Sequence, residues 1–234
     1  MRKGRFHPDK KGRYLSRRQF LKMSGGLAII VGTGDALKKS IWYENGVVAF
    51  PVCEGYLLVD SKKCQGCLTC MLACSLAHEG KESLSLSRIK ILQDSLAKFP
   101  EDLEMAQCRQ CVEPKCVEAC PAEALYVDEK HGNVRRIDEE KCIGCGSCIE
   151  ACPYTPPRPV WDAEDEHALK CDLCLDSPYW DEKGGPNAKQ ACVELCPLGA
   201  LMFTKEIPVQ EGEEGYHVNL RGEGWKKLGF SIED

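Results

Sequence analysis

The chain has 234 residues, 17 of them cysteine, and a net charge of −5. This length allows one or two domains, and the cysteine content is its strongest departure from an average globular composition. With 43% apolar and 29% charged residues, the composition excludes a disordered chain. No stretch reaches the ~20 apolar residues that cross a bilayer, so we expect no direct membrane span.

Basic residues are concentrated at the N-terminus. Residues 1–40 contain eleven Lys or Arg and two Asp, whereas the rest of the chain is acidic and is therefore expected to bind no nucleic acid. Ser16, Arg17, Arg18, Phe20 and Leu21 precede a weakly apolar stretch and resemble a twin-arginine export signal. We expect a protein exported in the folded state, periplasmic or on the outer face of the cytoplasmic membrane. The alternative is a basic tail followed by a short helix.

Sixteen of the cysteines form four groups of four with short, regular spacings. The groups are Cys64, Cys67, Cys70 and Cys74; Cys108, Cys111, Cys116 and Cys120; Cys142, Cys145, Cys148 and Cys152; and Cys171, Cys174, Cys192 and Cys196. In the last three groups a proline follows the fourth cysteine. The spacing of the second and third groups is typical of bacterial ferredoxins that bind [4Fe–4S] clusters. The sequence therefore predicts four [4Fe–4S] clusters.

Other cysteine chemistry explains this pattern less well. Structural zinc often uses two separated C-x2-C pairs, which only the fourth group resembles. A disulfide scaffold would not need cysteines two residues apart in four repeated blocks. Covalent haem needs C-x-x-C-H, which is absent from the sequence. Cys53 belongs to no group and is expected to be a small buried residue, with a lipid-modified or reactive thiol as the alternative.

Short apolar runs suggest how the cysteine groups are arranged. Ala124–Val127 and Val134–Ile137 flank a polar turn and predict a hairpin between the second and third groups. Leu57–Val59 and Leu201–Thr204 are expected to form a similar pair. The predicted fold class is α+β, with duplicated bacterial-ferredoxin-like units that are rich in loops. The expected division is 1–45, export signal and linker; 46–107, first half of an outer unit, with an insertion; 108–160, an inserted unit; 161–205, second half of the outer unit; and 206–234, a tail that contacts a partner, with a tail packed on the chain's own body as the alternative.

The second, third and fourth groups, with the residues between their cysteines, resemble a known family. They are similar to the four-cluster electron-transfer subunit of dimethyl-sulfoxide-reductase-type molybdoenzymes, over about residues 55–205. Similar small subunits accompany tungsten-containing aldehyde oxidoreductases. Two features depart from the family: Ser75 stands where a proline follows the other groups, and the Cys174–Cys192 loop is long.

The resemblance implies that each cluster takes its fourth ligand from another group. The implied ligand sets are Cys64, Cys67, Cys70 and Cys196; Cys171, Cys174, Cys192 and Cys74; Cys108, Cys111, Cys116 and Cys152; and Cys142, Cys145, Cys148 and Cys120.

The sequence contains no recognisable catalytic motif of its own. We therefore expect an electron-transfer subunit that relays single electrons between a large catalytic pterin-containing subunit, with molybdenum or tungsten, and a membrane quinone-reactive or soluble partner. The alternatives are a subunit of a hydrogenase or other respiratory complex, or a free polyferredoxin carrier. The five histidines are expected at the surface. Arg109, Lys115 and Lys170 are expected to be solvated, with adjustment of cluster potentials as the alternative.

Overall fold

The computed structural model describes residues 41–42, 48–99, 101–210, 214–229 and 232. The twin-arginine sequence and almost all of the expected export segment lie outside these residues. Within them, no helix is long and apolar enough to cross a membrane.

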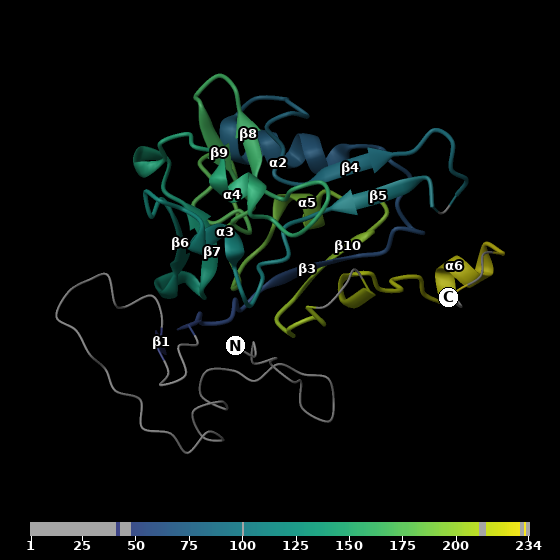
Figure 1. Ribbon diagram of the computed structural model, residues 1–234. Helices are drawn as coiled ribbons and strands as arrows, with labels where there is room; N and C mark the ends of the chain where they lie inside the picture. Colours follow the sequence, from purple (N-terminus) through teal and green to yellow (C-terminus); the bar gives the residue numbers. More distant parts are fainter. Residues whose placement is uncertain (1–40, 43–47, 100, 211–213, 230–231, 233–234) are drawn as a thin grey trace, which may run out of the picture.

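The described chain consists of short strands and short helices joined by long loops (Figure 1). The strands are β1 (Ile41–Trp42), β2 (Val48–Ala49), β3 (Tyr56–Val59), β4 (Lys90–Gln93), β5 (Leu103–Ala106), β6 (Leu125–Asp128), β7 (Val134–Ile137), β8 (Val160–Asp162), β9 (His167–Leu169) and β10 (Leu201–Thr204). The helices are α2 (Thr69–Glu79), α3 (Lys115–Glu118), α4 (Ser147–Glu150), α5 (Ala191–Glu194), α6 (Glu223–Lys227) and the 3-10 turns η2 (Glu129–His131), η3 (Glu139–Lys141) and η4 (Glu214–Tyr216). This composition agrees with the expected loop-rich α+β fold.

Among the described residues every sheet has two antiparallel strands, and the sequence predicts two of these sheets. β6 pairs with β7, with Leu125 opposite Ile137. β3 pairs with β10, with Val59 opposite Leu201, although the two strands are about 140 residues apart in the chain. The predicted strand pairs are therefore confirmed. The hairpins β4–β5 and β8–β9 were not predicted.

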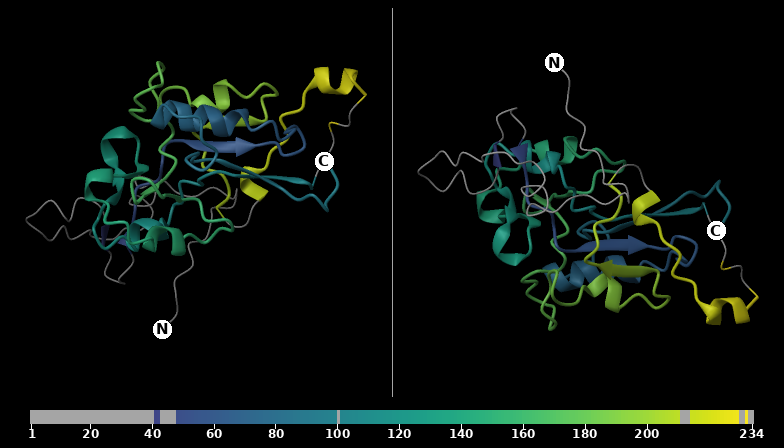
Figure 2. Two further views of the ribbon diagram at one scale, coloured as in Figure 1. Left: turned by 90° about the horizontal axis from the view of Figure 1, so that it is seen from above. Right: turned by 90° about the horizontal axis from the view of Figure 1, so that it is seen from below.

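The elements gather in two regions. The hairpin β6–β7 lies with α3 on one side of the molecule, whereas β3, β10 and the β4–β5 hairpin lie on the other (Figures 1 and 2). In the second region α2 packs against α5, and the strand pair β3–β10 is the centre of the main apolar core. Tyr56, Leu57 and Val59 of β3 are almost completely buried in it. The β3–β10 pair thus brings together two segments that flank residues 60–200 in the sequence.

The C-terminal segment packs against β3 before it leaves the body. Tyr216 is completely buried and its hydroxyl donates a 2.6 Å hydrogen bond to the Arg109 carbonyl. Val218 N–H donates to the Val59 carbonyl, and Leu220 N–H to the carboxylate of Asp60. α6 follows and lies away from the body in both views (Figure 2).

Candidate iron–sulfur sites

The structure brings the sixteen grouped cysteines into four neighbourhoods, which we call sets A to D. Set A is Cys64, Cys67, Cys70 and Cys196; set B is Cys74, Cys171, Cys174 and Cys192; set C is Cys108, Cys111, Cys116 and Cys152; set D is Cys120, Cys142, Cys145 and Cys148. The grouping is visible in the electrostatic effect of each thiol on its neighbours. These neighbourhoods have the same members as the ligand sets that the family resemblance implies.

Set A joins the beginning of α2 to the loop after α5. Burial raises the pKa of Cys70 to about 12, and the thiols of Cys64, Cys196 and Cys67 contribute to this shift. Cys67 is exposed, and the Thr69 hydroxyl 3.4 Å from its Sγ lowers its pKa. Set A therefore combines one exposed thiol, one buried thiol and two half-buried ones.

Set B is the most deeply buried of the four. All its cysteines are buried, and burial raises the pKa of Cys192 well above its usual value, together with the thiols of Cys174, Cys74 and Cys171. Cys74 comes from α2, four residues after Cys70, so these two cysteines lie on the same face of the helix. One helix thus contributes a cysteine to set A and another to set B.

An ion-pair network surrounds the Cys74 side of set B. His78 Nδ1 lies 2.8 Å from the Cys74 carbonyl oxygen, and Nε2 lies 2.9 Å from Oδ1 of Asp172. Arg88 donates to Asp172 at 2.8 Å and to Glu79 at 3.0 Å. Burial disfavours the imidazolium, but the hydrogen bonds to the Asp172 carboxylate and to the Cys74 thiol, 3.8 Å from Nδ1, outweigh it and raise the pKa of His78 to about 10.

This network corrects one expectation from the sequence. His78 was expected at the surface, but its side chain is only 4% exposed. The signal was present in the helical spacing, because His78 follows Cys74 by four residues and Cys70 by eight. Asp172 and Arg88 are distant in sequence, so no local pattern could have connected them with His78.

Set C is close to the C-terminal segment, because Tyr216 donates to the carbonyl of Arg109, which lies between Cys108 and Cys111. Burial raises the pKa of Cys116 to about 12; Lys170 opposes this rise, and the thiols of Cys108, Cys111 and Cys152 add to it. The guanidinium of Arg109 lies 4.3 Å from the ring centroid of Tyr216 and 5.0 Å from that of Tyr154. Arg109 was expected to be solvated, but it is completely buried.

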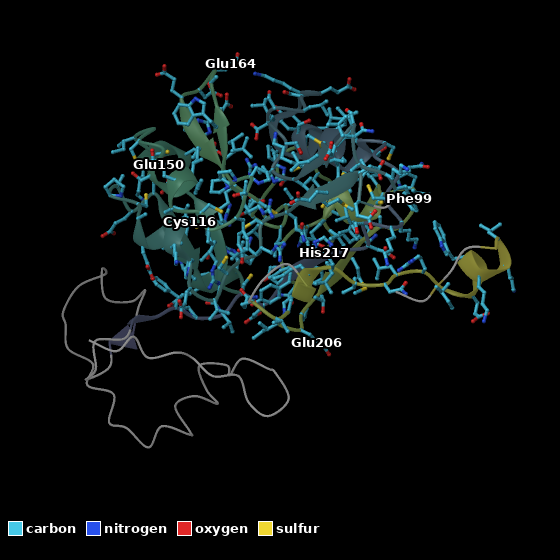
Figure 3. All side chains as sticks on the ribbon, turned by 45° about the vertical axis from the view of Figure 1, so that its right-hand side comes forward. Phe99, Cys116, Glu150, Glu164, Glu206 and His217 are labelled. Atoms are coloured by element: carbon cyan, nitrogen blue, oxygen red, sulfur yellow. The ribbon has the colours of Figure 1, made fainter. Side chains whose placement is uncertain are left out.

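Set D is at the other exposed end. Burial raises the pKa of Cys148 to about 11, and the thiols of Cys120, Cys142 and Cys145 contribute. Cys145 is exposed, and the Ser147 hydroxyl lowers its pKa. In Figure 3 Glu150, which follows Cys148 in α4, lies on the opposite side of the molecule from Phe99 of the β4–β5 turn.

The four sets neighbour one another in series. The negative charge of the Cys70 thiolate in set A contributes to the raised pKa of Cys192 in set B. In the same way, the Cys108 thiolate in set C contributes to the raised pKa of Cys171 in set B. Sets C and D meet at α3 and α4, which pack together. The segment around each helix contributes one cysteine to set C and one to set D. The order is therefore A, B, C, D, with an exposed cysteine in each outer set.

The fourth cysteine of each sequence group has the same type of backbone contact. Cys74, Cys120, Cys152 and Cys196 accept a backbone N–H from Arg88, Leu125, Arg158 and Ala200 at 3.3, 3.4, 3.3 and 3.3 Å. Such N–H groups stabilise a thiolate and influence the potential of a bound cluster.

These residues fit a [4Fe–4S] cluster. Four crowded, buried thiols repel one another when ionised, so they need a compensating positive charge, which iron supplies. Among the described residues, no three His, Cys, Asp or Glu side chains converge closely enough to hold a single metal ion. A cubane differs, because each of its four irons takes one cysteine and the ligands surround a volume rather than a point.

Cys53 lies apart from the four sets. It is 1% exposed, and its thiol donates to the Gly55 carbonyl at 3.2 Å. Burial raises its pKa, which keeps the thiol protonated. This placement agrees with the expected small buried residue.

Comparison with known proteins identifies the family. The 4Fe-4S dicluster domain matches residues 101–206, which include three of the four cysteine groups. YsaA of Escherichia coli (strain K12) is 33% identical over 162 residues, which cover 66% of this chain and 92% of YsaA. The polyferredoxin-like subunit of the aliphatic sulfonate oxidoreductase of Pyrococcus furiosus is 41% identical, covering 60% of this chain and 70% of that subunit.

A further relative extends over most of the chain. The formate dehydrogenase iron-sulfur subunit of Haemophilus influenzae is 28% identical, covering 88% of this chain and 70% of that subunit. These matches agree with the resemblance that the cysteine motifs carry. The chain belongs to the family of [4Fe–4S] electron-transfer subunits of oxidoreductases that includes the formate dehydrogenase iron–sulfur subunits.

Proposed function

We propose that sets A, B, C and D each hold one [4Fe–4S] cluster and that electrons pass through them in this order or its reverse. The observation that carries the proposal is the order in which the sets neighbour one another: Cys70 of set A raises the pKa of Cys192 in set B, Cys108 of set C raises that of Cys171 in set B, and α3 and α4 pack sets C and D together. Each bound cluster accepts or releases one electron at a time.

The protein's own residues perform three tasks in this relay. The β3–β10 pair and α2 hold sets A and B together, so the distance between them is fixed by packed elements. Backbone N–H groups stabilise the fourth thiolate of every set. Burial of the set B cysteines keeps water from the middle of the relay, whereas Cys67 and Cys145 leave its two ends open.

The same arrangement supports a division into duplicated ferredoxin-like units. Sets C and D would form one unit, made by residues 108–160. Sets A and B would form the other, from 46–107 and 161–205, with the middle unit inserted. The strand pairs β6–β7 and β3–β10 are the corresponding hairpin-like elements of the two units.

The exposed outer sets suggest two partners, one at each end. We infer that one is a large catalytic oxidoreductase subunit containing a molybdenum or tungsten pterin, and the other a membrane quinone-reactive or soluble redox protein. Relatives that are subunits of formate dehydrogenase and of aliphatic sulfonate oxidoreductase support a catalytic partner.

The partner is tested by purifying the native complex without oxygen and measuring its metals. We expect about sixteen irons per chain, together with stoichiometric molybdenum or tungsten in a larger subunit. A protein that is isolated alone with its iron, and without either metal, would contradict the pterin partner. Zinc in place of iron would contradict the relay itself.

We also propose that the complex is exported in the folded state, because Arg17 and Arg18 form part of a twin-arginine sequence. Changing both residues to lysine should keep the full chain in the cytoplasm without altering its iron content. A matched variant, Lys38→Arg/Lys39→Arg, should be exported normally. Export of the double lysine variant at the normal level would rule out this route.

A further inference from the structure

Lys170 lies between the two inner cysteine sets. Its side chain is inside the protein, with 3% of the residue exposed. Its ammonium group donates to the carbonyl oxygens of Arg135, at 2.8 Å, and Cys171, at 3.1 Å. Arg135 belongs to β7, and its N–H donates at 2.9 Å to the side chain of Gln110, which lies between Cys108 and Cys111 of set C, whereas Cys171 belongs to set B. The ammonium group therefore connects the walls of the two sets.

The charge of Lys170 is not balanced by a carboxylate. In the described part of the chain no ion pair involves this residue, and the ionisable groups whose charges act most strongly on it are the thiols of Cys108, Cys116 and Cys171. Arg88 provides a contrast, because it is also buried but pairs with Asp172 and Glu79. A buried ammonium group without a counter-charge is unfavourable. The thiolates of sets B and C are the negative groups available to compensate it.

We propose that Lys170 sets the reduction potentials of the two inner clusters, raising those of sets B and C relative to their values without this charge. The inference rests on the proposed function, because it takes the two sets as cluster sites. Reduction adds one negative charge to a cluster, and a nearby fixed cation stabilises the added charge. Inside a protein this attraction is much less screened than in water.

The outer clusters should be much less affected. The thiols whose charges act most strongly on Lys170 belong to sets B and C. Lys170 therefore makes the middle of the relay easier to reduce, and an electron that enters at one end would not meet a barrier halfway. The alternative is a purely structural role, in which the ammonium group only links the Arg135 and Cys171 carbonyl groups.

Three variants of the full chain in its complex separate these roles. Lys170→Met removes the charge at similar length, Lys170→Arg retains it, and Lys81→Met is the control. Lys81 is exposed and pairs with Glu164 at 2.9 Å. The readouts are iron per chain and the midpoint potential of each cluster, from redox titrations followed by electron paramagnetic resonance.

We expect Lys170→Met to lower two of the four potentials by at least a tenfold change in the ratio of reduced to oxidised cluster, about 59 mV for one electron. Lys170→Arg and Lys81→Met should leave all four close to the wild-type values. If Lys170→Met does not retain its iron, Lys170→Gln, which keeps a donor for the carbonyl groups, is measured instead.

Two results would overturn the inference. One is a neutral variant with full iron and four unchanged potentials. The other is an equal decrease in Lys170→Arg, which would mean that shape rather than charge matters. Neither result would affect the proposed function, which fails only if the wild-type chain lacks its four clusters.

Discussion

Cys192 and Cys196 are four positions apart, but the structure places them in different sets. Cys192 is grouped with the other cysteines of set B, whose thiols raise its pKa. Cys196 instead raises the pKa of Cys64 and Cys70 in set A. The reason is local, because α5 ends between the two cysteines and the chain turns toward β10. Cysteines that are close in sequence therefore need not bind the same cluster.

Iron analysis of double variants tests this exchange of ligands. Cys64→Ala/Cys196→Ala removes two ligands of one set and should lose about four irons per chain. Cys64→Ala/Cys192→Ala removes one ligand from each of two sets and should lose about eight, because each [4Fe–4S] cluster needs four cysteines. Cys53→Ala should retain all of the iron. If each cluster used only cysteines from its own sequence group, the first double variant would also lose about eight irons.

The residue types and spacings could be predicted from the sequence, but the electrostatic surroundings could not. The four cysteine groups stand out because thiolates need short, regular spacing to reach one cluster. Lys170 and Arg109 were expected in solvent, which is the usual place of basic residues. Their burial depends on contacts with Cys171, Arg135, Tyr154 and Tyr216, which are brought together only by the fold.

The loop that carries set D depends on two glycines with different surroundings. Gly144 and Gly146 both have a positive φ, of 66° and 73°. A Cβ at Gly144 would lie 2.5 Å from the Glu166 carbonyl oxygen, whereas nothing lies within 4 Å of one at Gly146. A side chain at Gly144 would therefore clash with the backbone and also be strained by the positive φ. A side chain at Gly146 would be strained by the positive φ alone.

Alanine substitutions should separate these two effects. Gly144→Ala should displace the loop and lose about four irons per chain, the content of one cluster. Gly146→Ala should retain its iron and lower the stability by about 1 kcal/mol, the usual cost of a left-handed non-glycine residue. Iron analysis and thermal unfolding of both variants provide the measurement. Equal iron contents in the two variants would contradict the role assigned to the contact with Glu166.

The C-terminal segment also has two parts with different roles. The part around η4 is attached to β3 by Tyr216, Val218 and Leu220. α6 lies away from the body, and its neighbour Leu228 is 72% exposed. Only the first part should therefore contribute to the stability of the isolated chain.

Two truncations test this difference. A chain that ends at Gly222 should lose the visible absorbance of its clusters at nearly the wild-type temperature. A chain that ends at Gln210 loses the buried Tyr216, and this temperature should decrease by roughly 5 °C or more. Equal temperatures for the two truncated chains would show that Tyr216 does not stabilise the body.

At the level of elements, long-range pairing was easier to predict than local hairpins. β3 and β10 are apolar runs just outside the first and last cysteine groups, so their pairing follows from the repeat. β4 and β5 carry Lys90, Gln93 and Glu104 and lack a two-residue turn with Asn-Gly or a similar signal. Their pairing is determined by tertiary packing, with Ile89 and Met105 buried in the main core.

At the scale of the whole molecule, the four sets form a relay whose outer sets A and D each have an exposed cysteine, while set B is completely buried. All the cysteines of set B are buried and those of set C are buried or half-buried, whereas Cys67 and Cys145 are exposed in sets A and D. Bound clusters with four thiolates are negatively charged, so the buried cations Arg109 and Lys170 lie where they can compensate this charge. The same chain thus provides spacing, shielding and charge balance.

The most direct test of the relay is to count the electrons that the purified, oxygen-free protein accepts. Stepwise reductive titration, followed by electron paramagnetic resonance, should give four one-electron reductions per chain, with about sixteen irons. Interactions between neighbouring reduced clusters should broaden the spectrum as the later electrons enter. Fewer than four electrons with full iron, or four reductions without any such interaction, would contradict a chain of four neighbouring clusters.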